Sequence, residues 1–205
     1  MKVLVACEFS GVVRDAFLRN GHDAWSCDLL PTESPGPHYE QCVLEVLAST
    51  DGWDLLIAHP PCTYLCSSGI HWNKRRPERK AQTERALEFF TCLLNYKSIP
   101  MRAIENPVGI VSTRVRKPDQ YIQPYEYGHP ESKRTCLWLE GLPHLKPTNV
   151  LPLPSTGRWQ NQTASGQNRI GPSANRWKQR SVTYEGIAQA MADQWGPPEW
   201  SASHE

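Results

Sequence analysis

The feature that most constrains the fold is an apolar run at residues 53–58, which leads into the rigid triplet Pro60-Pro61-Cys62. An apolar run of this length is typical of a buried strand in a parallel sheet. The two prolines fix φ and withhold two backbone donors, so the turn after the strand is stiff. Ligands bind at the carboxyl ends of strands in open α/β sheets. The run therefore predicts that Cys62 is held at a ligand-binding edge, where a thiol is a candidate nucleophile.

Length and charge limit the number of domains and the kind of binding surface that this chain can form. The chain has 205 residues, enough for one α/β domain or for one domain with a small lobe. Its net charge of +1 indicates that any nucleic-acid surface must be local. The seven cysteines include no CxxC pair, which favours reduced thiols and predicts no metal site. With no apolar stretch of membrane-spanning length and no signal peptide before the first strand, we expect a soluble cytoplasmic protein.

The first part of the chain has the pattern of a nucleotide-binding sheet. We expect a strand at 2–7, a turn at 8–11, a helix at 12–20 and a second strand at 23–27, closed by Asp28. An acidic residue that ends the second strand of such a unit accepts hydrogen bonds from ribose hydroxyls. The pattern therefore predicts a doubly wound α/β fold with a nucleotide near Asp28.

The remaining segments alternate between apolar elements and polar loops. In chain order we expect a loop at 31–41, a short apolar element at 42–48, the strand at 53–58, a polar loop at 63–78, an amphipathic helix at 78–96, a strand at 101–104, a polar and aromatic segment at 113–134, a strand at 135–139, an irregular segment at 140–180 and a closing helix at 184–195.

Cys62 and Glu105 both follow predicted strands, so they share one sheet edge if those strands are neighbours. Methyl transfer to carbon 5 of a pyrimidine needs such a pair. Carbon 5 is too electron-poor to attack a methyl donor until a nucleophile adds at carbon 6. A carboxyl group at ring nitrogen 3 and the exocyclic amine then stabilises the charge that moves into the ring.

Taken in order, these motifs resemble the DNA (cytosine-5) methyltransferase family, and the resemblance spans nearly the whole chain. The family's Pro-Cys turn, Glu-Asn-Val, Phe-x-Gly turn and closing serine motif are similar to Pro60-Pro61-Cys62, Glu105-Asn106-Pro107, Phe9-Ser10-Gly11 and Arg180-Ser181-Val182-Thr183. The resemblance implies an α/β, Rossmann-like class I methyltransferase fold. It also implies a compact phage or prophage enzyme in the cytosol of a bacterium or infected host, with DNA modification or restriction-modification as its setting.

The resemblance further implies the domains. We expect residues 1–139 plus 181–197 to form the catalytic domain and residues 140–180 a reduced, irregular target-recognition lobe. Residues 198–205 would be a flexible tail.

Site roles follow from the same resemblance. Cys62 would attack carbon 6, Glu105 would bind the cytosine edge, and Lys133 or Arg134 would favour the thiolate and contact the cytosine carbonyl oxygen. S-adenosyl-L-methionine would be the cofactor. Its binding residues would be Asp28 at the ribose, Leu29 at the adenine, and Phe9, Ser10, Gly11, Pro60 and Ser181 around the rest of the molecule.

Basic residues near aromatic ones indicate where DNA could bind. Lys74, Arg75 and Arg76 follow the catalytic turn, where a closing loop could grip phosphates. Arg158, Arg176 and Lys178 stand beside tryptophans, as on nucleic-acid surfaces. A solvated face or ordinary packing is the alternative for both groups. We expect DNA as the partner, with no membrane and no metal; the oligomeric state stays open.

Two departures from the family keep alternatives open. Its Gln-x-Arg-x-Arg motif becomes Glu131-Ser132-Lys133-Arg134-Thr135, and Cys42 stands where an Asp is expected at the adenine amine. The first prediction is methyl transfer to cytosine carbon 5 in DNA. One alternative is the same chemistry on single strands or on a free nucleotide such as dCMP, and another is an inactive cofactor- or DNA-binding remnant. Transfer to an amino group is disfavoured, because Cys62 stands where such enzymes need an aromatic residue to stack the base.

Overall fold

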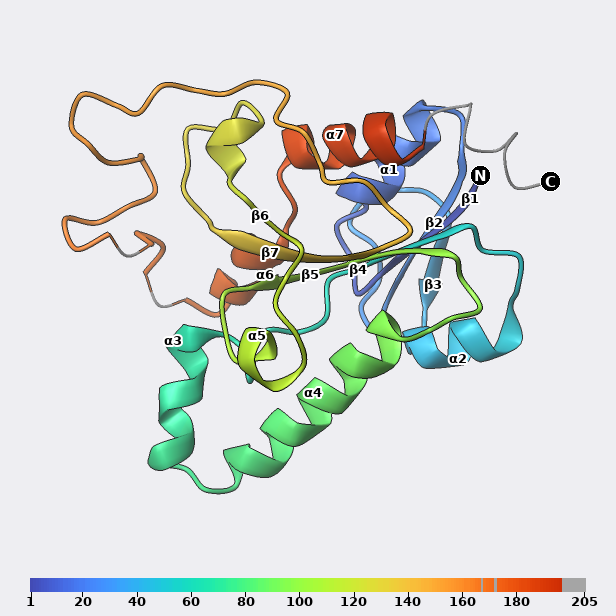
Figure 1. Cartoon of the computed structure of the whole chain (residues 1–205), viewed down its shortest axis with the longest axis horizontal. Helices are drawn as coiled ribbons and strands as arrows, with labels where there is room; N and C mark the ends of the chain where they lie inside the picture. The colour runs from blue at the N-terminus through green and yellow to red at the C-terminus, as the bar shows by residue number, and fades with distance from the viewer. Residues whose placement is uncertain (167, 172, 197–205) are drawn as a thin grey trace.

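The computed structural model describes residues 1–166, 168–171 and 173–196. Within these residues the chain forms one seven-stranded sheet with the order β3-β2-β1-β4-β5-β7-β6. The strands cross the middle of the molecule (Figure 1). Their bounds are β1 (Lys2–Ala6), β2 (Asp23–Asp28), β3 (His38–Glu40), β4 (Leu55–Ala58), β5 (Met101–Pro107), β6 (Gln120–Ile122) and β7 (Thr135–Glu140).

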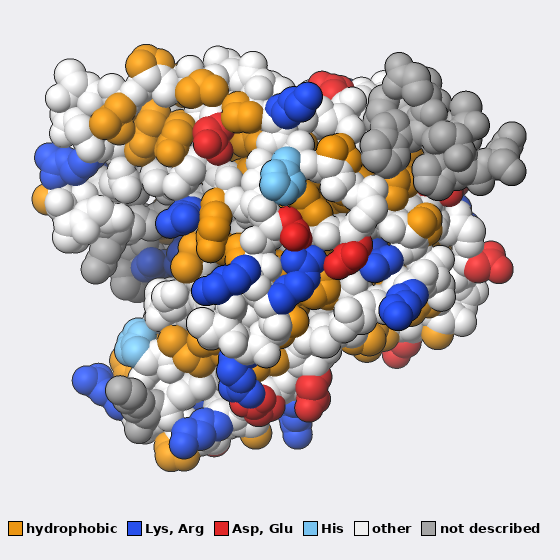
Figure 2. All heavy atoms as spheres, in the orientation of Figure 1, with side chains coloured by type: hydrophobic (Ala, Val, Ile, Leu, Met, Phe, Trp, Pro, Cys, Tyr) orange, Lys and Arg blue, Asp and Glu red, His pale blue; other side chains and the backbone are white. Residues whose placement is uncertain are grey.

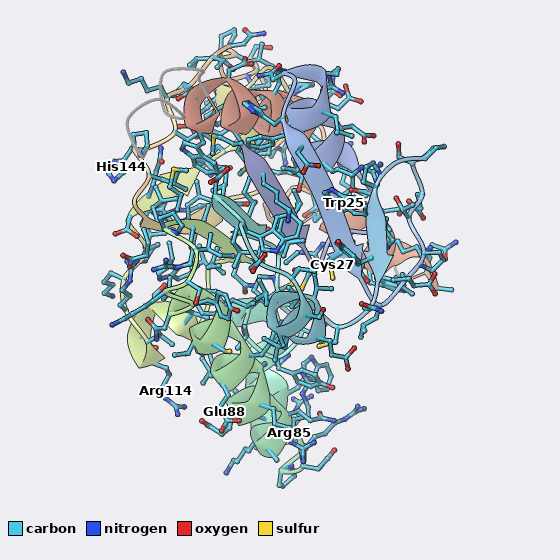
Figure 3. The ribbon with its side chains drawn as sticks, turned by 90° about the vertical axis from the view of Figure 1, so that its right-hand side faces the viewer. Trp25, Cys27, Arg85, Glu88, Arg114 and His144 are labelled. Atoms are coloured by element: carbon cyan, nitrogen blue, oxygen red, sulfur yellow. The ribbon has the colours of Figure 1, made fainter. Side chains whose placement is uncertain are left out.

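Helices cover both faces of this sheet. Helices α1 and α7 lie together on one face, and α2 and α4 lie on the other, as the two views in Figure 1 and Figure 3 show. The α-helices are α1 (Val12–Arg19), α2 (Val43–Ser49), α3 (Ser67–Ile70), α4 (Arg79–Leu94), α5 (Val111–Arg114), α6 (Arg176–Ser181) and α7 (Glu185–Trp195), with 3-10 turns at η1 (His71–Lys74) and η2 (Pro124–Glu126).

Strand direction changes once across the sheet. Strands β3, β2, β1, β4 and β5 run parallel, whereas β7 is antiparallel to both of its neighbours, β5 and β6. All four residues of β4 are fully buried, because this central strand has helices on both faces. The prediction of a buried parallel strand before Pro60 is therefore confirmed.

Most predicted elements are present, and the errors fall in short segments. Strand β3 lies inside the predicted 31–41 loop, and β6 lies inside the polar 113–134 segment. The predicted 63–78 loop contains α3 and η1. These elements are three or four residues long, too short to show a periodicity of their own. They form because a neighbour supplies partners, as Ser26 to Asp28 of β2 do for β3.

The segment after β7 is irregular, as predicted, up to α6. Among the described residues between Gly141 and Asn175 there is no helix and no strand. Side-chain contacts nevertheless attach it to the segment that precedes β7. The rings of Trp159 and Tyr125 stack at 4.7 Å with an interplanar angle of 4°, and Asn161 exchanges two hydrogen bonds with the backbone of Ser132.

Several observations bear on the remaining structural predictions. Helix α6 occupies the end of the segment predicted as irregular. The predicted flexible tail, 198–205, lies outside the described residues, and the division into two domains stays a prediction. None of the helices in the described ranges is long and apolar enough to cross a membrane. The same ranges contain no group of three or more His, Cys, Asp or Glu that could hold a metal ion.

Candidate active site

Cys62 follows β4, whereas Glu105 lies within the neighbouring strand β5, which continues to Pro107 and so past the predicted end at residue 104. Strands β4 and β5 pair in parallel, with Ala58 opposite Ile104, so both strands present their carboxyl ends at one edge. The two strands are therefore neighbours, which was the condition for placing Cys62 and Glu105 at one edge of the sheet. The side chain of Asn106 ties the two strand ends together, since its Nδ2 donates to the carbonyl oxygen of Pro60. The sheet edge therefore holds a thiol and a carboxyl group on a common frame.

A second thiol, Cys66, lies beside Cys62. The carbonyl of Cys62 accepts hydrogen bonds from the backbone N–H of Leu65 and of Cys66, at 3.0 and 2.9 Å, which closes one helical turn. This turn brings the two thiols into hydrogen-bonding contact. The sequence analysis gave Cys66 no role, although a spacing of four residues is the signal that could have found it.

The two thiols share their protons unequally. The hydrogen bond from Cys62, aided by the Ser68 hydroxyl and the N–H of Gly69, lowers the pKa of Cys66 to about 5. The same hydrogen bond, together with burial, raises the pKa of Cys62. A negative charge on this pair is therefore drawn toward Cys66, while Cys62 acts as its hydrogen-bond donor.

Glu105 is hydrogen-bonded to a histidine. The Nδ1 atom of His59 lies 3.1 Å from Oε2 of Glu105, and both side chains are largely buried. Burial alone would raise the pKa of Glu105, but the contact with His59 and the charge of Lys133 lower it overall. His59 directly precedes the Pro-Pro turn and had no predicted role. Its position before that turn carries no recognisable sequence signal.

A second buried carboxyl group, Glu8, lies in the turn after β1. Its carboxylate accepts the backbone N–H groups of Val13, at 2.7 Å, and of Arg14, at 3.2 Å, at the start of α1. Burial raises the pKa of Glu8, and the charge of His59 opposes that shift. His59 thus lies in the field of two buried carboxyl groups, one from the β1 turn and one from β5.

The structure separates the two basic candidates. The charge of Lys133 lowers the pKa of both Cys62 and Glu105, and Lys133 lines a small pocket with His59 and Glu105. Its Nζ donates to the carbonyl of Arg180 at 2.8 Å. Arg134 instead lies over the ring of Tyr121, 4.0 Å from its centroid. Lys133 is therefore the basic residue whose charge acts on the candidate catalytic groups.

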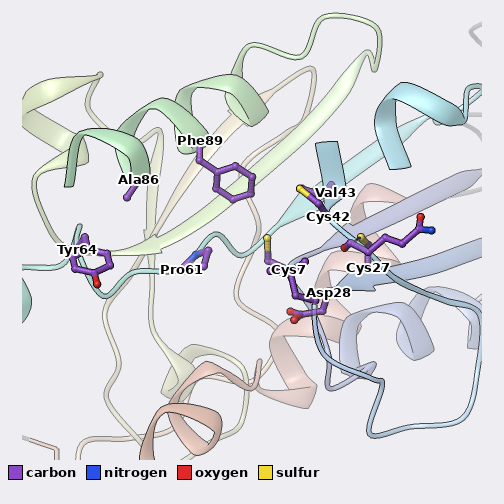
Figure 4. Close-up of a pocket in the computed structure, with 11 residues that line it drawn as sticks. Cys7, Cys27, Asp28, Cys42, Val43, Pro61, Tyr64, Ala86 and Phe89 are labelled. Atoms are coloured by element: carbon purple, nitrogen blue, oxygen red, sulfur yellow. Dashed lines mark hydrogen bonds between the residues drawn. The ribbon is translucent and has the colours of Figure 1, made fainter. Parts of the chain in front are cut away.

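A candidate ligand cavity lies across the carboxyl ends of β1 and β2. It has a volume of about 260 Å³, and Phe89 points from α4 toward the strand ends that carry Cys7 and Asp28 (Figure 4). Burial raises the pKa of Asp28, whose Oδ1 accepts the N–H of Leu30 at 3.0 Å. The cavity is lined by Cys7, Cys27, Asp28, Leu29, Gln41, Cys42, Val43, Pro61, Tyr64, Ala86 and Phe89.

This cavity contains part of the predicted cofactor set. Asp28 and Leu29 line it, and so does Cys42, the residue that departs from the family pattern. Tyr64 and Phe89 were not predicted, because a residue on the polar loop and one on an amphipathic helix give no sign of facing the strand ends. An acidic side chain among mostly apolar walls could hold a flat ring together with a hydrogen-bonding sugar.

The remaining predicted cofactor residues lie outside the lining of this cavity. Gly11 has φ +76°, and a Cβ atom there would lie 2.4 Å from Nη2 of the buried Arg14, so the turn requires glycine. The Ser10 hydroxyl bonds Glu8 at 3.4 Å. Pro60 accepts the Asn106 bond described above, and the Ser181 hydroxyl donates to the Lys178 carbonyl at 2.8 Å.

Phe9 is covered by helix α6. Its ring meets that of Trp177 edge to face at 6.0 Å, and the ammonium group of Lys178 lies 5.4 Å from its centroid. Lys178 also forms an ion pair with Glu33 at 3.1 Å. Lys178, predicted as a nucleic-acid contact, therefore packs against the Phe9 turn.

The other basic candidates are distributed over the surface. Arg75 and Arg76 lie over the ring of Trp72 in η1, at 5.6 and 5.7 Å. Arg158 is exposed, Arg176 is half-buried, and the side chain of Lys74 lies outside the described part of the structure. On the face seen in Figure 2, Lys and Arg side chains are interspersed with Asp and Glu rather than gathered in one patch. Among those of these candidates whose side chains the structure describes, Arg75 and Arg76 share an aromatic partner.

The sheet defines the class of protein. The order β3-β2-β1-β4-β5-β7-β6, with β7 antiparallel, is that of the Rossmann-like class I methyltransferase fold, which confirms the predicted fold class.

Comparison with solved structures finds similar chains, among them the following neighbour. It is a crystal structure provisionally described as a DNA modification methyltransferase encoded within a prophage of E. coli. The two chains are 14% identical, the TM-score is 0.48, and the match covers 75% of this chain and 52% of that one. The chain thus spans about half the length of that neighbour. No protein-family model and no curated protein matches the sequence.

Proposed function

We propose that this protein transfers a methyl group from S-adenosyl-L-methionine to carbon 5 of cytosine in DNA. The observation that carries the proposal is the arrangement of Cys62, in the turn after β4, and Glu105, on the neighbouring strand β5, with the charge of Lys133 acting on both. A nucleophile, a carboxyl group and a cation at one strand edge are the groups that this chemistry needs.

Cys62 would add to carbon 6 of the ring as a thiolate. The hydrogen bond with Cys66 and burial raise the pKa of Cys62, and the charge of Lys133 opposes that shift, so Lys133 would favour the attacking thiolate. Glu105 would accept a hydrogen bond from the exocyclic amine, and Lys133 would offset the charge that moves onto the carbonyl oxygen of the ring. These roles assign a function to each group at the edge.

The cavity at β1 and β2 supports the choice of cofactor. Asp28 offers a carboxylate to ribose hydroxyls, and Leu29, Val43 and Phe89 offer apolar contacts to an adenine ring. The sulfur of Cys42 is only a weak hydrogen-bond acceptor, so the adenine amine would depend on backbone carbonyls. When bound, the cofactor supplies an electrophilic methyl group. The Phe9–Gly11 turn and Ser181 would lie along its methionine end.

A second substrate is favoured by a specific observation. The described part of the 140–180 segment has no helix or strand, and we propose it as a reduced recognition lobe. With charges of both signs interspersed on the face in Figure 2, a single strand or a free cytosine nucleotide is the alternative substrate. Duplex DNA would require flipping the base out of the stack, at a cost of a few kcal/mol.

The test is covalent trapping. The protein is incubated with cofactor and with duplex DNA, single-stranded DNA or nucleotide that contains 5-fluorocytosine, and the adduct is detected by its mass. We expect an adduct with DNA, its loss in Cys62→Ala, and its retention in Cys92→Ala, an exposed cysteine on α4. An adduct with the nucleotide alone would exclude DNA as the substrate. No adduct with any of them would favour an inactive remnant, and an adduct in Cys62→Ala would contradict the choice of nucleophile.

A further inference from the structure

The contact between His59 and Glu105 belongs to a larger buried arrangement. His59 is the first residue after β4, and its side chain is 8% exposed. Its Nδ1 atom lies 3.1 Å from Oε2 of Glu105, whereas its Nε2 atom is buried and has no hydrogen-bond partner among the described residues. A buried ring nitrogen without a partner is uncommon enough to require an explanation.

The charges around His59 come from every element packed against it. Glu8 is contributed by the turn after β1, Glu105 by β5 and Lys133 by the segment before β7. Tyr184, which precedes α7, lines the same small pocket, and its hydroxyl donates to Glu131 at 2.5 Å. Cys62 lies three residues further along the chain and is affected by the charge of Glu105. Two carboxyl groups and one ammonium group thus surround the imidazole.

These neighbours bear on which ring nitrogens of His59 carry a proton. Burial raises the pKa of Glu8, but the charge of His59 and the two backbone N–H groups that Glu8 accepts stabilise its ionised form. A neutral imidazole that donates from Nδ1 to Glu105 would leave a bare lone pair at Nε2, buried in the field of the Glu8 carboxylate. A proton on Nε2 replaces this repulsion with attraction. The second proton on Nδ1 is then directed at Glu105.

We propose that His59 is the proton reservoir of the cytosine site and acts through Glu105. It holds one proton at the end of β4 and supplies it to ring nitrogen 3 when Cys62 adds to carbon 6. This inference rests on the proposed function. It assigns a positioning and proton-holding role to a residue that does not itself touch the substrate.

The step balances as follows. A sulfur lone pair of Cys62 forms the bond to carbon 6, and the π electrons of the carbon 5–carbon 6 bond move toward nitrogen 3. The Nδ1 proton of His59 moves to Glu105, and Glu105 passes a proton to nitrogen 3. His59 is then neutral and Glu105 is a carboxylate again. After carbon 5 has gained its methyl group it loses its proton to water, the carbon–sulfur bond breaks, and the nitrogen 3 proton returns to His59 by the same route.

The sharpest variant is His59→Asn, because an Asn amide can replace Nδ1 as a donor to Glu105 but cannot carry a proton. We expect kcat to fall by roughly 10²-fold, the usual scale for general acid–base catalysis, with KM for cytosine DNA little changed. Since His59 must be protonated to act, wild-type kcat should decline toward alkaline pH, and this alkaline limb should disappear in His59→Asn. The matched control is His144→Asn, on the exposed loop after β7.

A structural role predicts a different pattern. If His59 only holds Glu105 in place, His59→Asn should keep the wild-type kcat and its alkaline limb, and only His59→Ala should lose activity. If His59→Asn keeps the wild-type kcat, or keeps the alkaline limb of the pH profile, the inference is overturned. The proposed function is then unaffected.

A second readout does not depend on methyl transfer. In ¹⁵N NMR of the wild-type protein under the conditions of the activity assay, both ring nitrogens of His59 should carry protons, and Glu105→Gln should remove one of them. A neutral imidazole in the wild type would overturn the inference. If the wild type forms no 5-fluorocytosine adduct, the proposed function fails, and this NMR result still decides whether His59 holds the proton.

Discussion

The Nδ2 atom of Asn106, on β5, donates a 2.8 Å hydrogen bond to the backbone carbonyl of Pro60, in the turn after β4. Asn106 is 1% exposed, so water does not compete for this bond. The bond joins the Glu-Asn-Pro segment directly to the turn that carries Cys62. Two motifs separated by more than forty residues in the chain thereby become parts of one rigid edge.

Removal of this bond should weaken the edge. In Asn106→Ala the carbonyl of Pro60 loses its buried partner, so we expect the free energy of unfolding to fall by about 1–3 kcal/mol. Urea denaturation of both proteins measures the difference. The control is Asn95→Ala, an exposed position at the end of α4, which should stay within ~0.5 kcal/mol of the wild type. Equal effects at the two positions would contradict the structural role of Asn106.

Gly11 and Gly21 form a matched pair for the turn after β1. Both have positive φ, +76° and +81°, but a Cβ atom at Gly11 would lie 2.4 Å from Arg14, whereas at Gly21 it would meet nothing within 4 Å. Gly21→Ala should therefore cost only backbone strain, roughly 1 kcal/mol. Gly11→Ala should cost clearly more, because Arg14 must also move. Thermal unfolding measures both variants, and a larger loss in Gly21→Ala would contradict this geometry.

Cys66 should react as a thiolate in mildly acidic solution. The hydrogen bond from Cys62 lowers the pKa of Cys66 to about 5, so alkylation by iodoacetamide should reach its plateau rate well below neutral pH. The exposed Cys92 on α4 is the reference thiol in the same samples. Peptide mass spectrometry after brief labelling across pH gives both profiles.

The cause of this shift can be tested separately. In Cys62→Ala the donor to Cys66 is gone, so the labelling profile of Cys66 should move to higher pH. Coincident profiles for Cys66 and Cys92 in the wild type would show that the two adjacent thiols are not coupled.

Lys133 and Arg134 should differ in their effect on catalysis. The charge of Lys133 acts on Cys62 and Glu105, whereas the guanidinium of Arg134 lies over Tyr121. We expect Lys133→Met to slow formation of the 5-fluorocytosine adduct by about 10-fold or more, as loss of a charged hydrogen bond implies. Arg134→Met should have the smaller effect. The reverse order would assign the catalytic charge to Arg134.

The sequence predicted the structure correctly where a segment has a recognisable pattern of apolar residues, prolines or turns. The apolar 53–58 run and the Pro-Pro turn after it correctly predicted a buried parallel strand. The β–turn–α–β pattern that ends at Asp28 predicted the first half of the sheet and one wall of the cavity. Strands β3 and β6 were missed because three residues contain too little pattern and depend on pairing with a neighbour.

The candidate site was predictable only in part. Cys62 and Glu105 could be paired from sequence, because the carboxyl ends of adjacent parallel strands share an edge. The sequence could not show whether Lys133 or Arg134 faces the site, because the side chains of consecutive residues point in different directions. Only the packing of the folded chain shows which one does. The packing of Trp177 and Lys178 on Phe9 joins residues from opposite ends of the chain.

By itself, the sequence determined the order of strands and turns, the rigid Pro60–Cys62 segment and the class of fold, because these depend on local apolar runs and on the restricted backbone of proline and glycine. Only the tertiary structure decided that Cys66 contacts Cys62 and that His59 lies in the field of Glu8 and Glu105. Those relationships arise from burial and from charges on separate strands. A buried charge takes its properties from whatever the fold places beside it, and sequence spacing does not record that.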